Sequence, residues 1–313
     1  MKIYSNEILG KKNLLISGNH TSGKSLMAAY LKCYKGLGII NKEPAIGAIT
    51  SLQYSKKINL EVGKQLLNFV INNAIRSNQI GRNINTKISD ESSVFNYSEP
   101  LTYINSILDL KKQNEKKYNV FDTHNVILSY NLWKKTLNKF YTIQLERHPI
   151  DIVESCYRSK SFFYNTNKYK KILIFEKKKK LIPFYLYNIK INNFSNINLT
   201  IEVIYQIFKK NYLFYKKLAK DEKKRFLIID FEKLKSNPKS SLIMIKKSLG
   251  LKFNKYLEST MSKETTTKEK IIKRRESNYK KIFKMANKIQ MKKLEIISRI
   301  YDTKFSKLFL NQK

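Results

Sequence analysis

Residues 13–31 read NLLISGNHTSGKSLMAAYL, which is a short apolar run, a turn that contains two glycines, and an apolar pattern of helical type. The spacing of Gly18, Gly23, Lys24 and Ser25 in this stretch is typical of the phosphate-binding loop of nucleotide enzymes. In such a loop the backbone N–H groups converge on an anion, and the following helix adds a partial positive charge. The stretch therefore predicts a strand, an anion-binding loop and a helix, without identifying the anion.

Three further apolar runs have the length of buried strands, and each precedes a polar turn and a helical pattern. They are YNVFDT (118–123), FYTIQLE (140–146) and FLIID (226–230). Together with residues 13–17 they predict an α/β fold of the P-loop NTPase type, a three-layer α/β/α sandwich with a mainly parallel central sheet. Ligands of such sheets bind at the carboxyl ends of the strands, where GNHTSGKS, DTHN and ERHP all fall.

The 313-residue chain carries 62 Lys and Arg against 24 Asp and Glu, a formal charge of +38. An excess of this kind is typical of proteins that bind nucleic acid or anionic membranes. Only eight residues are Arg, however, and Asn, Ile and Tyr are abundant, as an A+T-rich coding sequence would give whatever the function. The charge favours anionic ligands in general without identifying one.

Cys33 and Cys156 have no spacing that would form a zinc site or a disulfide framework, which predicts a reduced, intracellular compartment. The N-terminal apolar run is too short for a signal peptide, and no stretch reaches the roughly 18 apolar residues of a membrane span. We therefore expect a cytoplasmic protein with a single domain over residues 1–313, and the oligomeric state stays open.

Two polar positions at predicted strand ends have the chemistry of a nucleotide site. Arg147 precedes a helix that begins at Pro149, and Ser155 follows on that helix, so the two side chains are suited to hold one phosphate. The alternative is that Arg147 pairs with Glu146 or Asp151 and that Ser155 packs in the interior. His124 in DTHN is placed to take a proton from a hydroxyl group, although a lone His is more often structural.

Taken together, these motifs resemble the sulfotransferase superfamily, whose members use 3′-phosphoadenosine 5′-phosphosulfate (PAPS). HTSGKS stands in the place of the family's phosphosulfate loop, DTH in the place of its KTH, and RHPIDIVES fits its 3′-phosphate motif R-x-P-x-D-x-x-x-S. Residues 226–251 are similar to a later strand and helix of the family, so the resemblance spans residues 12 to about 251.

The resemblance implies a role for each matching residue. The loop residues that would bind the cofactor are His20, Thr21, Ser22, Gly23, Lys24 and Ser25. Arg147 and Ser155 would hold the 3′-phosphate, and Arg274 and Arg275 in KRRESNYKK are candidates for the C-terminal part of that site. His124 would be the catalytic base, while Lys24 would stabilise the leaving phosphate because Thr21 occupies the position of the family's basic residue.

The resemblance predicts transfer of a sulfuryl group from PAPS to a hydroxyl or, second, an amine of a small molecule or glycan, with no metal. Residues 78–98 and 160–198 are predicted acceptor-side insertions, and their Tyr- and Asn-rich composition favours a sugar-like acceptor. Residues 255–280 are predicted to cap the cofactor. The first alternative is a metal-dependent P-loop kinase or nucleotidase in which Ser25 and Asp122 bind Mg²⁺. The second is a non-enzymatic, basic nucleic-acid-binding protein, although no nucleic acid is expected.

Overall fold

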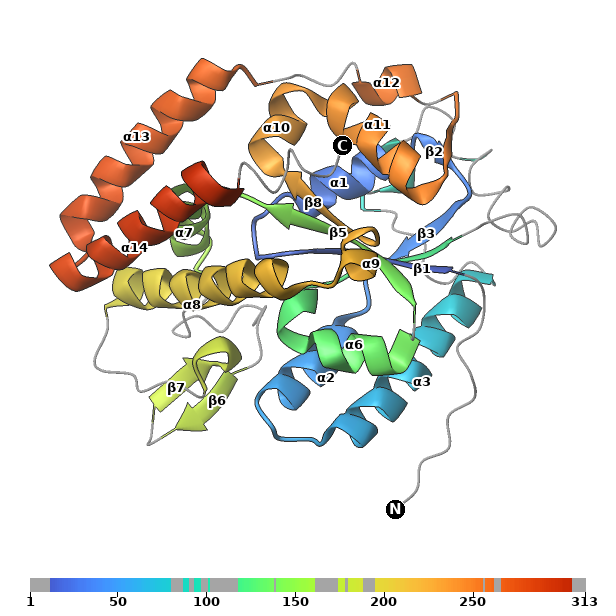
Figure 1. Ribbon diagram of the computed structural model, residues 1–313, viewed down its shortest axis with the longest axis horizontal. Coiled ribbons are helices and arrows are strands. Elements are labelled where there is room, and N and C mark those ends of the chain that lie inside the picture. Colours follow the sequence, from blue (N-terminus) through green and yellow to red (C-terminus); the bar gives the residue numbers. More distant parts are fainter. Residues whose placement is uncertain are drawn as a thin grey trace.

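Strand β1 (Lys12–Gly18) lies in the middle of the central sheet, and every residue of it after Lys12 is buried. The computed structural model describes residues 12–79, 87–89, 93–96, 101, 118–137, 139–160, 174–177, 180–187, 195–255, 257–261 and 266–305 (Figure 1). A strand that is buried on both faces needs apolar side chains without alternation, and LLI at 14–16 supplies them.

Within the described residues the central sheet has five strands in the order β3-β4-β1-β5-β8, and every neighbouring pair is parallel. The other four strands are β3 (Leu37–Asn41), β4 (Tyr118–Asp122), β5 (Phe140–Glu146) and β8 (Phe226–Asp230). All four strands predicted from the sequence are confirmed to within one residue at either end. The sequence did not predict β3, whose run LGIIN is short and contains Gly38.

Helices cover both faces of the sheet, which confirms the three-layer sandwich (Figure 1). Leu14 and Ile16 face the layer of α1 (Lys24–Leu31), α10 (Phe231–Ser236) and α11 (Pro238–Leu249). Leu15 faces the opposite layer of α2 (Pro44–Tyr54), α3 (Leu60–Gln79) and α6 (Tyr130–Leu137). Successive side chains of a strand point to opposite faces, so β1 contributes to both cores.

The long helix α8 (Asn196–Lys217) joins this second layer, because its buried side chains pack with Phe226 and Ile228 of β8. It contacts α7 (Pro149–Arg158) and α14 (Lys288–Ile300), while α13 (Lys268–Met285) lies against α7 (Figure 1). The remaining strands form two antiparallel pairs, β2 (Tyr34–Lys35) with β9 (Lys252–Phe253) and β6 (Ile174–Lys177) with β7 (Lys180–Pro183). Short helices α9 (Lys220–Lys223) and α12 (Leu257–Met261) complete the described elements of α type.

The three segments with predicted functions are described in part. Of residues 78–98, the structure describes 78–79 at the end of α3, 87–89, and 93–96 with a 3₁₀ turn over Val94–Asn96. Of residues 160–198, it describes the β6–β7 pair, a 3₁₀ turn over Phe184–Leu186 and the start of α8. Residues 255–280 contain α12 and most of α13. The other residues of these segments lie outside the described ones, and their acceptor and capping roles stay predictions.

Candidate functional site

The glycine turn between β1 and α1 has the backbone of a loop that wraps around an anion. Gly23 is the N-cap residue of α1 and has a left-handed φ of 95°, and Thr21 is also left-handed, with φ of 61°. Ser22 stabilises the turn, since its hydroxyl donates to the Asn19 carbonyl at 2.8 Å. A Cβ atom on Gly23 would lie 2.2 Å from the ring of Phe231, so this position excludes every side chain.

The sheet order places this loop at a topological switch point. Strand β1 has β4 on one side and β5 on the other, so the segments after these two strands diverge around the loop. Asp122 is the last residue of β4, His124 follows that strand, and Arg147 follows β5. Residues that are more than 100 positions apart in the chain therefore meet at one edge of the sheet.

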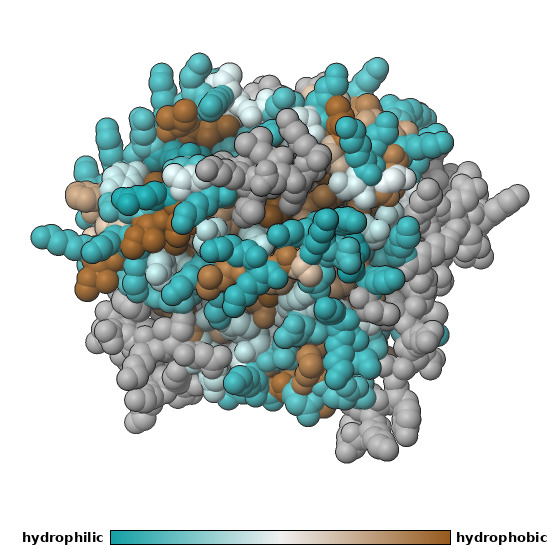
Figure 2. Space-filling model, viewed as in Figure 1, coloured by the Kyte–Doolittle hydropathy of each residue, from teal (hydrophilic) through white to brown (hydrophobic). Residues whose placement is uncertain are grey.

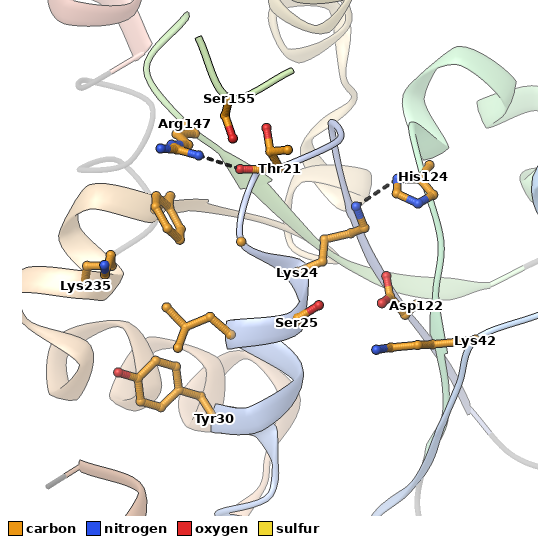
Figure 3. Close-up of a pocket in the computed structure, with 13 residues that line it drawn as sticks. Thr21, Lys24, Ser25, Tyr30, Lys42, Asp122, His124, Arg147, Ser155 and Lys235 are labelled. Atoms are coloured by element: carbon orange, nitrogen blue, oxygen red, sulfur yellow. Dashed lines mark hydrogen bonds between the residues drawn. The ribbon is translucent and has the colours of Figure 1, made fainter. Parts of the chain in front are cut away.

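A cavity of about 650 Å³ lies at this edge and has the predicted residues in its wall (Figure 3). The predicted residues that line it are Thr21, Gly23, Lys24, Ser25, His124, Arg147 and Ser155. The other lining residues are Leu26, Tyr30, Lys42, Asp122, Phe231 and Lys235. Four of the predicted cofactor residues, His20, Ser22, Arg274 and Arg275, are not among the residues that line it.

Lys24 is the first residue of α1 and is buried, although it carries an amine (Figure 3). Its Nζ donates to the Asn19 carbonyl at 3.2 Å and lies 2.8 Å from Nδ1 of His124. Burial lowers the pKa of Lys24 from 10.5 to about 8, against the opposing charge of Asp122. At neutral pH the amine is still mostly protonated, so it donates a hydrogen bond to Nδ1 of His124.

His124 lies between Lys24 and a second imidazole. The rings of His124 and His20 stack with centroids 4.3 Å apart and an angle of 18° between their planes. Burial, followed by the charges of Lys24 and His20, holds the pKa of His124 well below its ordinary value of 6.5. His124 is therefore a neutral imidazole at physiological pH, the form that is able to accept a proton.

Arg147 lies across the loop from His124 and is fixed by two contacts (Figure 3). Its Nη1 donates to the Thr21 carbonyl at 2.8 Å, and its guanidinium group lies 5.0 Å from the centre of the Phe231 ring. The buried Nε atom has no hydrogen-bond partner among the described residues. Because a buried donor without a partner costs free energy, this atom marks a place where an anion from outside the chain would be stabilised.

Arg274 and Arg275 of α13 bind a buried carboxylate rather than the cavity. Nη2 of Arg274 and Nε of Arg275 lie 3.5 Å and 3.4 Å from Oδ2 of Asp151 in α7, and Nδ2 of Asn278 donates to Oδ1 at 2.8 Å. Nη2 of Arg275 also lies 3.7 Å from Oε1 of Glu232. These contacts attach α13 to α7, the helix that carries Ser155. The two arginines therefore stabilise the position of α7 without lining the cavity.

Sequence reasoning missed two basic residues of the cavity, Lys42 and Lys235. Lys42 follows β3 directly, so the failure to predict that strand also hid its carboxyl end. Lys235 lies in α10, in the helix that follows β8. A search for basic side chains within about five residues of every predicted strand end would have found Lys235 but not Lys42. With Lys24 and Arg147 they give the cavity four basic side chains against the single carboxylate of Asp122.

The part of the chain that the structure describes has neither a metal-binding cluster nor a membrane-spanning helix. No group of three or more His, Cys, Asp or Glu side chains there is arranged to hold a metal ion. None of the helices there has both the length and the apolar composition needed to cross a bilayer. Ser25 and Asp122, the pair that a metal-dependent enzyme would use, both line the cavity.

One family model and several solved structures are similar to this chain. A sequence model described as the sulfotransferase domain matches residues 27–308. The sulfotransferase domain from the Synechococcus PCC 7002 olefin synthase is similar at 10% identity and a TM-score of 0.45, over 96% of this chain and 98% of that one. Sulfotransferase STF1 from Mycobacterium tuberculosis H37Rv is similar at 10% identity and a TM-score of 0.42, over 89% of this chain and 78% of that one. No curated protein matches the chain.

Proposed function

The chain belongs to the sulfotransferase domain family, and on that premise we propose that it transfers a sulfuryl group from PAPS to a hydroxyl group of an acceptor. The observation that carries the proposal is that Lys24, His124, Arg147 and Ser155 line one cavity, and the family resemblance assigns three different roles to these four residues. They come from three different segments of the chain and meet only because of the order of the strands.

The residues around the loop fit the anionic groups of the cofactor. The ring of Phe231 occupies the space that a side chain on Gly23 would need. Gly23 is also the N-cap residue of helix α1. A helix N-terminus with exposed backbone N–H groups stabilises phosphate. The buried Nε of Arg147 offers a further donor. Ser155 lies beside Arg147 in the wall of the cavity (Figure 3). Arg147 and Ser155 would accordingly hold the 3′-phosphate and so select PAPS over ATP.

Lys24 would stabilise the leaving phosphate. PAPS, when bound, supplies the sulfuryl group and a phosphate leaving group, on which negative charge develops during transfer. A protonated amine in a buried site stabilises such charge more strongly than the same amine in water. Two of the three N–H bonds of Lys24 are directed to Asn19 and His124 by the distances given above, which leaves one for an anion at the loop.

His124 would take the proton of the acceptor hydroxyl, and its contact with Lys24 sets a condition on that step. While Lys24 donates to Nδ1, that nitrogen has no lone pair for a proton. Lys24 would therefore have to turn this N–H away from Nδ1, for example toward the phosphate of the donor, before His124 accepts the proton. The position of His124 and its neutral form support this role, while its lowered pKa makes it a weaker base than a free imidazole.

We propose a small molecule or a glycan as the acceptor and a cytoplasmic location, both of which rest on the sequence. The test of the main function is sulfuryl transfer from labelled PAPS to a panel of glycans, phenols and lipids. His124→Ala and Lys24→Ala should each lower kcat by about a hundredfold or more, with nucleotide affinity reduced much less by His124→Ala. Full turnover by His124→Ala with the true acceptor would leave Asp122 as the next candidate for the base.

A metal-dependent kinase or nucleotidase is the second candidate, because Ser25 and Asp122 line the same cavity as Lys24. A thermal-shift screen separates the two candidates and also tests nucleic acid. Its ligands are 3′-phosphoadenosine 5′-phosphate, ATP with and without Mg²⁺, and an oligonucleotide. Stabilisation by the 3′-phosphorylated nucleotide without metal supports the sulfotransferase, whereas stabilisation only by ATP with Mg²⁺ would support the kinase.

A further inference from the structure

Helices α13 and α14 form a strongly basic surface that the proposed reaction does not use. Their two sequences contain twelve Lys and Arg but only three Glu. Three of the basic residues are directed inward, since Arg274 and Arg275 contact Asp151, and Lys293 contacts Glu202 of α8. The exposed basic residues are Lys268, Lys270, Lys273, Lys280, Lys281, Lys284, Lys288, Lys292 and Arg299. The excess of positive charge on this surface therefore faces solvent.

Large apolar side chains are exposed between these lysines. Phe283 is 60% exposed and Ile289 is 70% exposed, and Ile272, Met285 and Ile296 are each more than 40% exposed. Five of the eleven large apolar side chains that the described part of the chain exposes lie on these two helices. Figure 2 shows the corresponding brown groups among teal ones at the left of the molecule, where Figure 1 draws α13 and α14.

Each helix of the pair carries an exposed apolar stripe. Ile272 and Phe283 are eleven residues apart, about three helical turns, so they lie on one stripe of α13. Ile289 and Ile296 are seven residues apart on α14 and share a stripe in the same way. The buried stripes of the two helices are different ones, with Ile271, Asn278 and Ile282 on α13 and Met291, Leu294 and Ile297 on α14. We use the name α13–α14 face for the nine exposed basic residues together with Ile272, Phe283, Ile289 and Ile296.

The composition of the α13–α14 face distinguishes among possible partners. A protein interface has few lysines and few charges at its apolar centre, whereas here lysines surround every apolar group. A second copy of the chain would present the same positive charge and be repelled. Nucleic acid would bind the lysines, but its phosphate backbone gives no gain for burying Ile289 or Ile296. A lipid surface offers both kinds of contact at once, anionic head groups for the lysines and acyl chains for the apolar groups.

We propose that the α13–α14 face docks on an anionic lipid bilayer. The helices would lie in the plane of the membrane, with Phe283 and Ile289 in the boundary between head groups and acyl chains. The cavity is close by, because Arg274 and Arg275 on the inner side of α13 contact Asp151 in the helix that carries Ser155. Docking is independent of the proposed reaction, since none of the residues on this face lines the cavity.

The test is flotation of the full chain with vesicles of phosphatidylcholine alone and with about one quarter phosphatidylserine. We expect at least tenfold stronger association with the anionic vesicles, and loss of it at about 0.5 M salt, where charges are screened over a few ångströms. The triple variant Lys280→Glu, Lys281→Glu, Lys284→Glu and the double variant Phe283→Ser, Ile289→Ser should each lower association by about tenfold.

Matched controls keep the result specific to this face. Lys217→Glu, Lys220→Glu, Lys223→Glu changes the net charge by the same amount at the end of α8 and in α9, and Phe69→Ser removes a ring that is 68% exposed on α3. Both should leave association within about twofold, and thermal unfolding checks that every variant is folded. Equal losses for the face and control variants, no preference for anionic vesicles, or binding of an oligonucleotide in place of vesicles would overturn the proposal.

Discussion

Replacement of Gly23 by alanine tests whether the loop, Phe231 and Arg147 form one packed unit. Gly23 has φ of 95°, a conformation that costs a residue with a Cβ atom roughly 1–2 kcal/mol. The new Cβ would also lie 2.2 Å from two ring atoms of Phe231, which is 8% exposed and therefore has little room to move. Overpacking of a buried ring costs about 1–3 kcal/mol, so Gly23→Ala should lower the free energy of unfolding by about 2–5 kcal/mol.

Gly47 provides the matched control. It lies inside α2, and a Cβ atom added there would meet nothing within 4 Å. Alanine is favoured over glycine in the interior of a helix, so Gly47→Ala should raise the free energy of unfolding by about 0.5–1 kcal/mol. Opposite signs for the same chemical change would show that the local backbone and packing, and not the residue type, decide the outcome.

The assay is urea unfolding of four proteins: wild type, Gly23→Ala, Phe231→Ala and the double variant. Removal of the ring relieves the clash but not the backbone strain, so Gly23→Ala should cost about 1–3 kcal/mol less in the Phe231→Ala background. Phe231 also lies under the guanidinium group of Arg147, so nucleotide affinity should fall with Gly23→Ala. Additive free energies in the double variant would refute the claim that Phe231 fills the space beside Gly23.

The remaining predictions concern charge. Arg147→Ala should weaken binding of 3′-phosphoadenosine 5′-phosphate by about 1.5–3 kcal/mol in calorimetry and leave the analogue without the 3′-phosphate almost unchanged. The lowered pKa of Lys24, about 8, means that its amine loses its proton as pH rises through that value, so nucleotide affinity should fall above about pH 8. Burial raises the pKa of Glu146 from 4.5 to about 7, so the free energy of unfolding should fall by about 3 kcal/mol between these pH values, and Glu146→Gln should abolish the fall.

The sign of the Glu146 effect follows from linkage. Between pH 4.5 and 7 the unfolded chain ionises this carboxyl freely, while the folded chain keeps it protonated among Gln144, Asn211 and Tyr215, which all donate to Oε1. The unfolded state binds fewer protons there, so stability decreases as pH rises. Equal slopes for wild type and Glu146→Gln would contradict this assignment. The Arg147 prediction would be wrong if Arg147→Ala weakened binding of both nucleotides equally. The Lys24 prediction would be wrong if the nucleotide affinity of Lys24→Ala also fell above about pH 8.

The class of the fold and the glycine turn between β1 and α1 could be predicted from local sequence alone. Fully apolar runs such as LLI at 14–16 predict strands buried on both faces, and the run was found in the central strand of the sheet. The glycines of the loop were readable for the same reason, because a left-handed φ such as that of Gly23 is a local property of the backbone. Local propensity and periodicity depend only on residues that are close in the chain, so they can be predicted from the sequence.

Which side chains meet could not be predicted from the sequence, because it depends on how the elements pack in three dimensions. The sequence offered Arg274 and Arg275 as cofactor residues, but the packing of α13 on α7 directs them to the buried Asp151. The structure also shows that Lys24 donates to Nδ1 of His124, a contact across 100 residues that leaves the proton of the neutral imidazole on Nε2. Such contacts depend on the order of the strands and on the cost of burying a charge without a partner, and both are properties of the whole packed chain rather than of any segment.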